Sequence, residues 1–357
     1  MPSILFLASH RPNRSPSQRY RFEQYIPFLE SSGFRCRISW IISEKDDADF
    51  YQKGKTWKKF IILWKSLWIR WKDYRNYSKY DIIFVQREAS LLGFTWFERK
   101  ITRSGAKFVF DFDDSIWLLD TSEGNKKYEW LKDPEKTARN IRHAHLVIAG
   151  NTYLSNYAKH YNHNVRIFPT TIDTLNHRKI ENTSEELIIG WCGSITTIKH
   201  FEYSTGFLAK IKKKFPTLRI RVVGDASYQN PSLNISGESW SAQTEVAVIN
   251  TFTIGIMPLP DDEWAKGKCG LKALSYMACE IPTVVSPVGV NTSIITHGVN
   301  GFLASGEDDW IQCIELLLIN PELRKKIGSE GRKTVIEKFS VESQKSNYLD
   351  AFKSLLR

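Results

Sequence analysis

The sequence lacks several features that would settle its class at once. No run approaches the roughly 18–20 uncharged apolar residues that a membrane-spanning helix needs. The opening residues, Ser3 to Ser9, lack the basic and long apolar segments of a secretion signal, so we expect a buried first strand there. The five cysteines are odd in number, scattered and without a Cys-x-x-Cys pair. These absences argue against a disulfide framework and a zinc site, and they favour a reducing, cytoplasmic setting.

Charge is present but unevenly placed. The 357 residues carry a net charge of +11. Residues 1–180 hold 31 basic and 19 acidic side chains, a net of +12, whereas residues 181–357 hold 19 and 20, a net of −1. This asymmetry predicts an anionic partner for the first half only.

Short apolar runs alternate with helical patterns along the whole chain, which predicts an α/β fold with parallel sheets covered by helices. The length fits two domains. We expect a first Rossmann-like domain over 1–172, a polar linker over 173–186, a second Rossmann-like domain over 187–338, and a terminal helix over 339–357 that returns to the first domain. Ligands of such sheets bind beyond the carboxyl ends of the strands, here in the cleft between the two sheets.

The expected strands are 3–9, 35–42, 81–86, 107–112, 145–149 and 164–168 in the first half, and 187–192, 219–223, 252–257, 282–286 and 300–304 in the second. The expected helices are 17–31, 53–76, 89–103, 133–142 and 151–161, followed by 199–214, 242–250, 270–278, 307–318, 321–337 and 340–356.

One anion-binding pattern follows strand 187–192. Gly193 allows a sharp turn, Ser194 precedes a helix start, and Lys199 lies one turn further on. Simple helix capping explains the same residues equally well. Gly224 and Asp225, which end strand 219–223, are expected to face the same site.

A more specific pattern lies between residues 253 and 289. An acidic loop with Asp262 and Glu263 precedes the run Gly267-Lys268-Cys269-Gly270-Leu271-Lys272, which leads into a helix. Glycines and lysines at a helix start suit a diphosphate, and carboxylates suit sugar hydroxyls. A solvated surface loop is the alternative.

The run 253–304 resembles the donor-binding region of the retaining glycosyltransferases of family four, which have the GT-B fold. The stretches Ser286–Asn291 and His297–Leu303 extend the match. The strand-turn-helix at 188–199 resembles another motif of that family, with Lys199 in place of its diphosphate-binding lysine. The resemblance implies a retaining, metal-independent hexosyl- or related transferase. Its donor would be a nucleotide diphosphate sugar, and its acceptor a hydroxyl of a glycan or lipid-linked saccharide. It implies no other cofactor.

The chain departs from the pattern of that family in three ways. Ser194 stands where the family has an arginine, and Gly267 and Ser275 stand where it has a pair of glutamates, although Asp262 and Glu263 are near enough in sequence to substitute. Glu280 stands where the family has a helix-ending glycine. Two alternatives therefore stay open: a nucleotide-sugar epimerase of the same fold, and a non-catalytic GT-B protein that binds a membrane or a polyanion.

Two groups in the first half are candidates for the acceptor side. Arg19 and Arg21 are expected in the first turn of helix 17–31, where cations are unfavourable unless an anion binds; solvated arginines are the alternative. Strand 107–112 leads into Asp113 and Asp114, of which either could orient or deprotonate the acceptor hydroxyl. We expect no metal at this Asp-x-Asp, and find no histidine near the strand end. The catalytic candidates are thus Asp113, Asp114, Lys199 and Lys268.

The basic excess is concentrated in residues 53–80, which hold nine Lys or Arg and one acid. Trp57, Trp64, Trp68 and Trp71 share one face of a helix there. Tryptophans with a lysine-rich opposite face predict peripheral attachment to an anionic membrane surface. A core helix with a solvated basic face is the main alternative. Nucleic acid is not expected, since no such binding motif accompanies the stretch.

Overall fold

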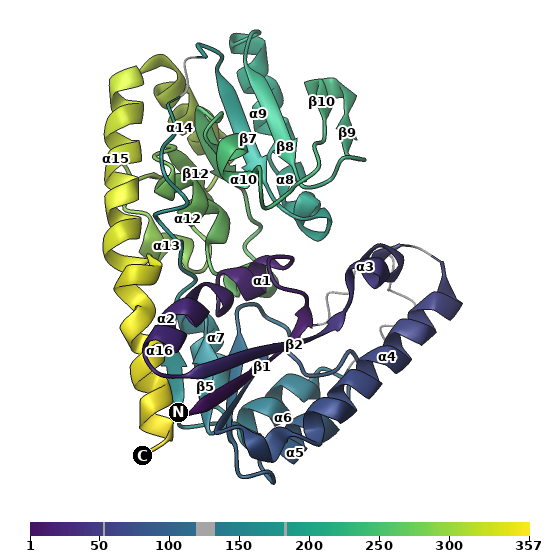
Figure 1. The fold of residues 1–357 in the computed structure, drawn as a ribbon. Helices are drawn as coiled ribbons and strands as arrows, with labels where there is room; N and C mark the ends of the chain where they lie inside the picture. Colours follow the sequence, from purple (N-terminus) through teal and green to yellow (C-terminus); the bar gives the residue numbers. More distant parts are fainter. Residues whose placement is uncertain (53, 119–132, 182–183) are drawn as a thin grey trace. The chain divides into compact units, whose positions relative to one another are not determined.

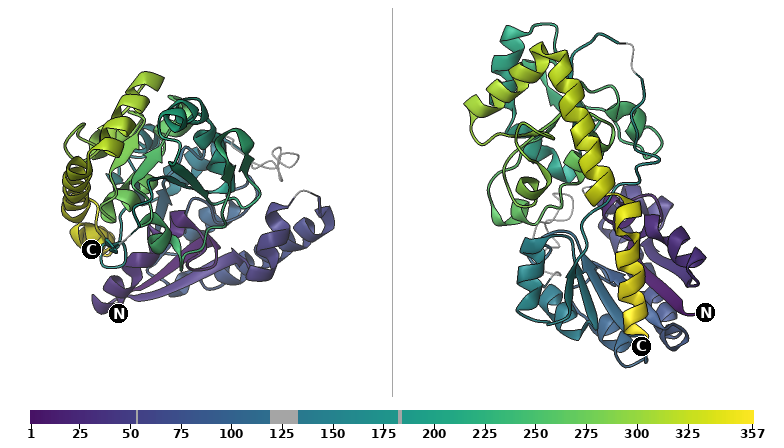
Figure 2. Two further views of the ribbon diagram at one scale, coloured as in Figure 1. Left: turned by 90° about the horizontal axis from the view of Figure 1, so that it is seen from above. Right: turned by 90° about the vertical axis from the view of Figure 1, so that its left-hand side faces the viewer.

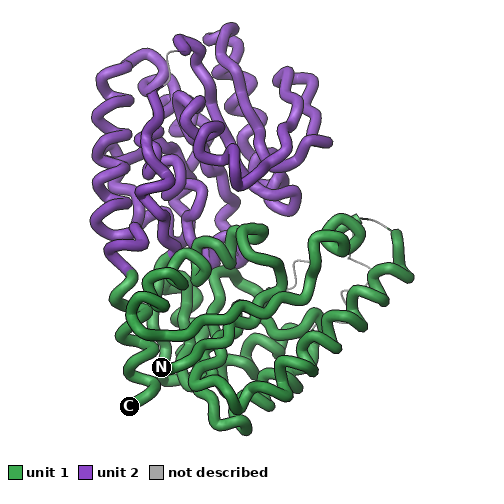
Figure 3. The backbone as a smooth tube through the Cα atoms, viewed as in Figure 1, with its two compact units in different colours: residues 1–169, 345–357 green, residues 170–344 purple. Residues whose placement is uncertain are grey.

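The computed structural model describes residues 1–52, 54–118, 133–181 and 184–357. The chain forms two compact units, unit 1 with residues 1–169 and 345–357, and unit 2 with residues 170–344 (Figure 3). Each unit has its own parallel sheet flanked by helices (Figures 1 and 2). The predicted α/β architecture with two Rossmann-like sheets is confirmed. Lys53, where one predicted helix begins, and residues 182–183 of the predicted linker lie outside the described residues.

The sheet of unit 1 has six strands in the order β2-β1-β3-β4-β5-β6, and all neighbours are parallel. Its central strands are apolar on both faces because helices cover both sides of it. Each predicted strand is present within a few residues. The strands are β1 Ser3–His10, β2 Arg35–Ile42, β3 Ile82–Gln86, β4 Lys107–Phe112, β5 Leu146–Ala149 and β6 Val165–Ile167.

The helices of unit 1 follow the prediction less closely. The helix expected over 17–31 is broken into three short pieces, since Pro27 starts a new helix. Helix α3 was not predicted; Ser43 caps it and acidic residues fill its first turn. The helices are α1 Pro16–Arg19, η1 Glu23–Tyr25, α2 Ile26–Ser31, α3 Glu44–Tyr51, α4 Thr56–Tyr74, η2 Tyr77–Lys79, α5 Trp96–Ile101, α6 Glu135–His143 and α7 Thr152–Lys159.

The sheet of unit 2 has five parallel strands in the order β13-β12-β11-β7-β8. They are β7 Ile188–Cys192, β8 Arg219–Val223, β11 Ile254–Met257, β12 Thr283–Val285 and β13 Phe302–Leu303. A two-stranded antiparallel ribbon of β9 Gln229–Asn230 and β10 Ile235–Ser236 was not predicted. The helices are η4 Ile195–Thr197, α8 Ile198–Glu202, α9 Thr205–Lys214, η5 Pro231–Leu233, α10 Glu245–Ile249, α11 Glu263–Lys266, α12 Leu271–Ala278, α13 Asn291–Ile294, α14 Glu307–Ile319 and α15 Pro321–Lys338.

The last helix, α16 (Val341–Leu355), packs its C-terminal part into unit 1 (Figure 2). The ring centroids of Tyr348 and Tyr25 lie 4.2 Å apart, and the Tyr348 hydroxyl donates to the Arg21 carbonyl at 2.5 Å. Phe352 meets Phe84 edge-on at 6.2 Å between ring centroids. Both side chains are buried, so the end of the chain is part of the core of unit 1.

Candidate functional site

The loops after β7 and β8 touch at the carboxyl edge of the sheet of unit 2. The Gly193 amide donates to the Val223 carbonyl at 2.9 Å. Gly224 has a φ of +138°, and a Cβ there would lie 1.9 Å from the Gly193 carbonyl oxygen. Only glycine fits this position, because any side chain would push the two loops apart. The structure thus brings together Gly193 and Gly224, two predicted site residues that are far apart in the sequence.

Ser194 caps the short helix η4, as the capping interpretation predicts. Its backbone amide donates to Thr197 Oγ1 at 3.0 Å, and its hydroxyl lies 3.0 Å from Thr196 Oγ1. These hydroxyls are exposed or partly exposed. Helix α8 follows directly and carries Lys199 and His200.

Three lysines from separate segments act on one buried histidine. Burial, together with the positive charges of Lys272, Lys268 and Lys199, lowers the pKa of His200 to about 4. Lys199 belongs to α8, Lys268 to the loop between α11 and α12, and Lys272 to the first turn of α12. In the part of the chain that the structure describes, the buried Nδ1 of His200 has no hydrogen-bond partner. The predicted phosphate lysines therefore converge, on a histidine that sequence reasoning missed.

Helix α12 begins beside this cluster. Gly270 is its N-cap, with a φ of +72° and no side-chain capping bond, and no acidic residue occupies the first turn. A Cβ on Gly270 would lie 2.3 Å from Ile294 Cδ1. Lys272 Nζ lies 5.3 Å from the Trp191 ring centroid. Cations at an uncapped helix N-terminus are unfavourable alone, and an anion bound there would relieve both features.

The remaining residues of the predicted glycine-lysine run lie close by. Gly267 ends α11, Cys269 is buried with its Sγ 3.7 Å from the Gly267 carbonyl oxygen, and Leu271 opens α12. Lys268 Nζ lies 4.9 Å from the Trp264 ring centroid. The run is thus a short, tightly turned connection that sets Lys268 at the helix start.

The predicted sugar-binding carboxylates have structural partners. Asp262 caps α11 by accepting from the Ala265 amide at 2.7 Å. Glu263 pairs with Lys266 at 2.9 Å on the surface. Asp225 accepts from the amide and hydroxyl of Ser227 at 2.9 and 2.6 Å. A role toward a sugar stays a prediction for all three.

Ser275 stands where the glycosyltransferases that this chain resembles have a glutamate. Its side chain is turned back onto the backbone of α12. Its hydroxyl donates to the Leu271 carbonyl at 2.9 Å, and the residue is buried. A serine that bonds its own helix has no reach toward a ligand. The departure from the family pattern is therefore also a difference in geometry.

In unit 1, Arg21 is not placed as the sequence analysis expected. It lies beyond the end of α1 and is fully buried, and its guanidinium binds Asp111 through Nε at 3.2 Å and also through Nη2. It also donates to the Phe168 carbonyl. A buried carboxylate such as Asp111 needs a positive partner, and Arg21 supplies it. Arg21 is therefore a structural residue inside unit 1 and does not face a ligand. Arg19 is the last residue of α1, which is a single turn long, so it lies in the first turn as expected, and its guanidinium carbon lies 4.9 Å from the Tyr20 ring centroid.

Arg87 forms ion pairs with both Asp113 and Asp114. The sequence analysis did not identify this residue. Arg87 follows β3 with a φ of +62°, an unusual conformation for a side chain of this size. Its Nε donates to Asp113 at 2.7 Å, and its Nη2 lies 3.4 Å from Asp114. Burial favours a higher pKa for Asp113, but the Arg87 charge and hydrogen bond outweigh it, so the pKa of Asp113 is lowered. The nearby charge thus holds Asp113 ionised.

His10, which the sequence analysis did not single out, is within electrostatic reach of Arg87. His10 ends β1, and its Nε2 lies 2.9 Å from the Tyr51 hydroxyl. Burial lowers the pKa of His10 to about 4, and the charges of Arg14, Arg11 and Arg87 add to this against Asp47. His10 was overlooked because it is far in sequence from strand β4. Among the described residues, no three His, Cys, Asp or Glu side chains gather as a metal site would require.

The predicted tryptophan face on α4 is exposed. All four residues, Trp57, Trp64, Trp68 and Trp71, are open to solvent. The core-helix alternative required them to be buried, so it is wrong.

The family match to known proteins lies within unit 2. Residues 186–320 match the family model of glycosyl transferases group 1. N-acetyl-alpha-D-glucosaminyl L-malate synthase of Bacillus anthracis is 34% identical over 95 residues, which is 26% of this chain and 25% of that protein. The chain likewise aligns with only 35% of a Bacillus subtilis relative.

Two solved structures match the whole chain in fold. Sucrose-phosphate synthase from Thermosynechococcus elongatus has a TM-score of 0.74 at 14% identity, covering 99% of both chains. HepE of Anabaena, solved with UDP and glucose, has a TM-score of 0.65 at 13% identity, covering 99% of this chain and 100% of that one. The chain thus has the GT-B fold that the resemblance implied, and its residues 186–320 match the family model of glycosyl transferases group 1.

Proposed function

We propose that the protein transfers a sugar from a nucleotide diphosphate sugar to a hydroxyl of a glycan or lipid-linked acceptor, with retention and without a metal ion. One observation carries the proposal: the charges of Lys199, Lys268 and Lys272 all act on His200, and Lys272 lies in the first turn of α12 after the N-cap Gly270. The family match over 186–320 and the UDP in the related fold of HepE support a nucleotide donor.

The lysine cluster would hold the diphosphate. Backbone amides at the start of α12 would donate hydrogen bonds to one phosphate. The three ammonium groups would offset the negative charge that develops on the diphosphate as its bond to the sugar breaks. This electrostatic stabilisation of the leaving group is what speeds transfer without a metal. Gly193 and Gly224 would let the loops after β7 and β8 pack against each other at the edge of the donor site, since a Cβ on either residue would collide with neighbouring protein atoms.

The acceptor side would use Asp113 and Asp114. Because the pKa of Asp113 is lowered, Asp113 is a weak base at neutral pH, and its part would be to accept a hydrogen bond from the acceptor hydroxyl. Arg87 would keep both carboxylates in position. His10 is a second acceptor-side candidate, since its low pKa leaves the imidazole neutral, so that one ring nitrogen could accept a hydrogen bond from the acceptor hydroxyl.

Calorimetry with UDP, GDP and ADP tests the donor site. We expect Lys268→Ala to weaken binding of the preferred diphosphate at least about tenfold, through the loss of one charge-assisted contact. Lys266→Ala is the matched control, because that lysine lies two positions away but pairs with Glu263. Equal affinity for the wild type and Lys268→Ala would remove the phosphate assignment.

An activity assay separates transfer from its rivals. Release of free nucleotide only when acceptor is added supports transfer. Conversion of the donor sugar without acceptor would indicate an epimerase. Absence of any nucleotide-sugar binding would indicate a non-catalytic protein. The buried Ser275, in place of a family glutamate, is the feature that favours this alternative.

A further inference from the structure

Helix α4 exposes its aromatic face to solvent and buries charged residues, the opposite of an ordinary surface helix. Its outward side chains are aromatic: Trp57 is 73% exposed, Trp64 62%, Trp68 52% and Trp71 45%. Phe60 and Ile61 are exposed beside them. Soluble helices normally direct such residues toward the core, so this face has been left open for a ligand or partner.

The face of α4 that packs on unit 1 contains Ile62 and a hydrogen-bonded cluster of polar side chains. Arg70 is 0% exposed and donates to the carbonyls of Ala8 and Ala89, both at 2.6 Å. It also pairs with Asp73 at 2.9 Å, and Asp73 accepts from the Ser39 hydroxyl at 2.6 Å. These contacts anchor α4 without help from its tryptophans. The aromatic face is therefore not required to hold the helix in place.

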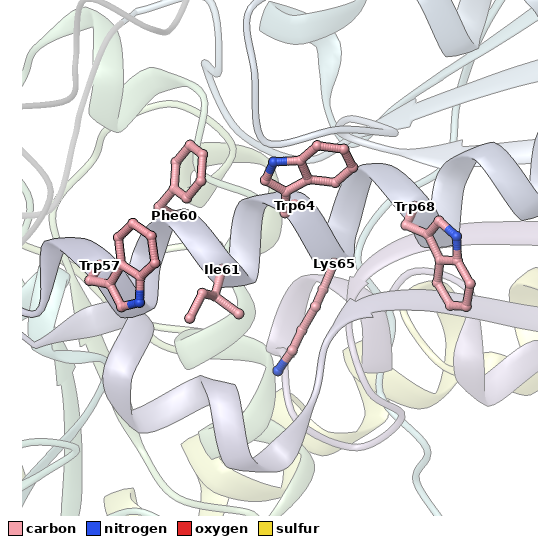
Figure 4. A pocket seen from close by; sticks show the side chains of 6 residues that line it. All are labelled: Trp57, Phe60, Ile61, Trp64, Lys65 and Trp68. Carbon is pink, nitrogen blue, oxygen red and sulfur yellow. The ribbon is translucent and has the colours of Figure 1, made fainter.

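The aromatic side chains enclose a shallow hollow of about 330 Å³. Figure 4 shows its lining spread along one stretch of α4. The lining comprises Trp57, Phe60, Ile61, Trp64, Lys65 and Trp68. Because the whole lining comes from one helix, with no second described element to close over it, the hollow is part of an open helix face (Figure 4).

Cations border the aromatic face instead of opposing it. Lys58, Lys65 and Lys72 recur every seven residues, which places them along one flank of the tryptophans. Lys72 Nζ lies 3.3 Å from the Trp68 ring centroid, and the Arg75 guanidinium carbon 4.9 Å from that of Trp71. The sequence analysis expected the lysines on the opposite face; that face is the buried one. Lys58 pairs with Asp49 at 2.8 Å and Lys65 with Asp46 at 3.0 Å, both residues of α3. The two lysine side chains are still more than half exposed, so they can exchange a carboxylate for an anionic headgroup while the rings enter the interface.

We propose that this face of α4 binds the surface of an anionic lipid bilayer, with the helix lying parallel to the membrane. Tryptophan rings favour the headgroup–acyl boundary, and the basic flank complements anionic headgroups. Among the described residues no helix is long and apolar enough to cross a bilayer, which fits contact with one leaflet. Charge complementarity favours lipid over a second copy of this basic chain, whose own cations would be brought together.

Sedimentation with vesicles tests the proposal on the full chain, without donor or acceptor. Vesicles of phosphatidylcholine mixed with phosphatidylglycerol should carry the protein down, whereas pure phosphatidylcholine should retain little. Trp64→Ala/Trp68→Ala should weaken vesicle binding at least about tenfold. Leu316→Ala/Ile319→Ala is the matched control, because it removes two exposed apolar side chains from α14 in unit 2 and should leave binding unchanged.

A charge variant, Lys58→Gln/Lys65→Gln/Lys72→Gln, should weaken binding to the anionic vesicles and reduce its dependence on salt. Failure of the wild type to sediment with anionic vesicles overturns the proposal. So does a tryptophan-dependent dimer in sedimentation velocity without vesicle binding, which would assign the face to a second copy. Nucleotide binding by calorimetry is a separate measurement, so failure here leaves the donor site standing.

Discussion

Lysines serve two different arrangements in the two units. In unit 2, Lys199, Lys268 and Lys272 come from three segments and meet around His200, in a region of nearly balanced charge. In unit 1, Lys58, Lys65 and Lys72 lie along one helix beside exposed tryptophans. The first arrangement suits a compact dianion, and the second an extended anionic surface. Net charge alone points to the first half of the chain, whereas the proposed phosphate site lies in the second; the placement of the lysines distinguishes the two arrangements.

The largest expected effect concerns how α4 is held. Arg70→Met should lower the free energy of unfolding by about 3–5 kcal/mol, because it leaves Asp73 buried without its cation. Urea unfolding measures this change. Arg75→Met, on the exposed face of the same stretch, should stay within about 0.5 kcal/mol of the wild type. Similar losses for both variants would contradict the polar anchoring of α4.

The second effect is a pH dependence that belongs to unit 2. His200 has a pKa of about 4 when folded, against a usual value of 6.5. The unfolded chain therefore takes up this proton first as the pH falls, and the free energy of unfolding drops by up to about 3 kcal/mol between pH 6.5 and 4. His10 has the same lowered pKa and adds its own slope over this range, so His200→Gln should reduce the slope of the urea unfolding curves by about half, and His10→Gln/His200→Gln should remove most of it. A wild-type slope in that variant would show that other groups cause it.

The third effect compares two lysines that both lie over tryptophan rings. Lys272→Ala should weaken nucleotide diphosphate binding about tenfold, near 1.4 kcal/mol, whereas Lys72→Ala should leave it unchanged. Calorimetry with the preferred diphosphate measures both. Equal losses would mean that general charge, not the cluster, attracts the nucleotide.

The smallest effect compares two kinds of tryptophan. Trp64→Ala should change the free energy of unfolding by less than about 0.5 kcal/mol, because its side chain is already open to solvent. Trp191→Ala, in the core of unit 2, should cost about 3–5 kcal/mol. Thermal unfolding with calorimetric enthalpies gives both values. A large loss for Trp64→Ala would mean that the exposed face supports the fold after all.

The sheets could be predicted because their strands are apolar runs with clear ends. The ribbon of β9 and β10 escaped because two-residue strands leave no period to detect. The tryptophan spacing correctly put four rings on one face of α4. Spacing alone does not say which face is buried, and here Arg70 on the other face fills the interior.

The candidate site was predictable where a local motif builds it. The turn before α12 placed Lys268 and Lys272 correctly because glycine and helix start lie together in the sequence. Arg21, Arg87 and His10 depend on partners far along the chain. Arg21 meets Asp111 only after the sheet has formed, so its sequence neighbourhood suggested a surface role that burial overrides.

Membrane binding through α4 would also change how often the protein meets its acceptor. A chain held flat on a bilayer searches for a lipid-linked acceptor in two dimensions instead of three, so the local abundance of acceptor follows its density in the leaflet. Lipid composition would then set the rate of encounter through headgroup charge, without any change at the site in unit 2.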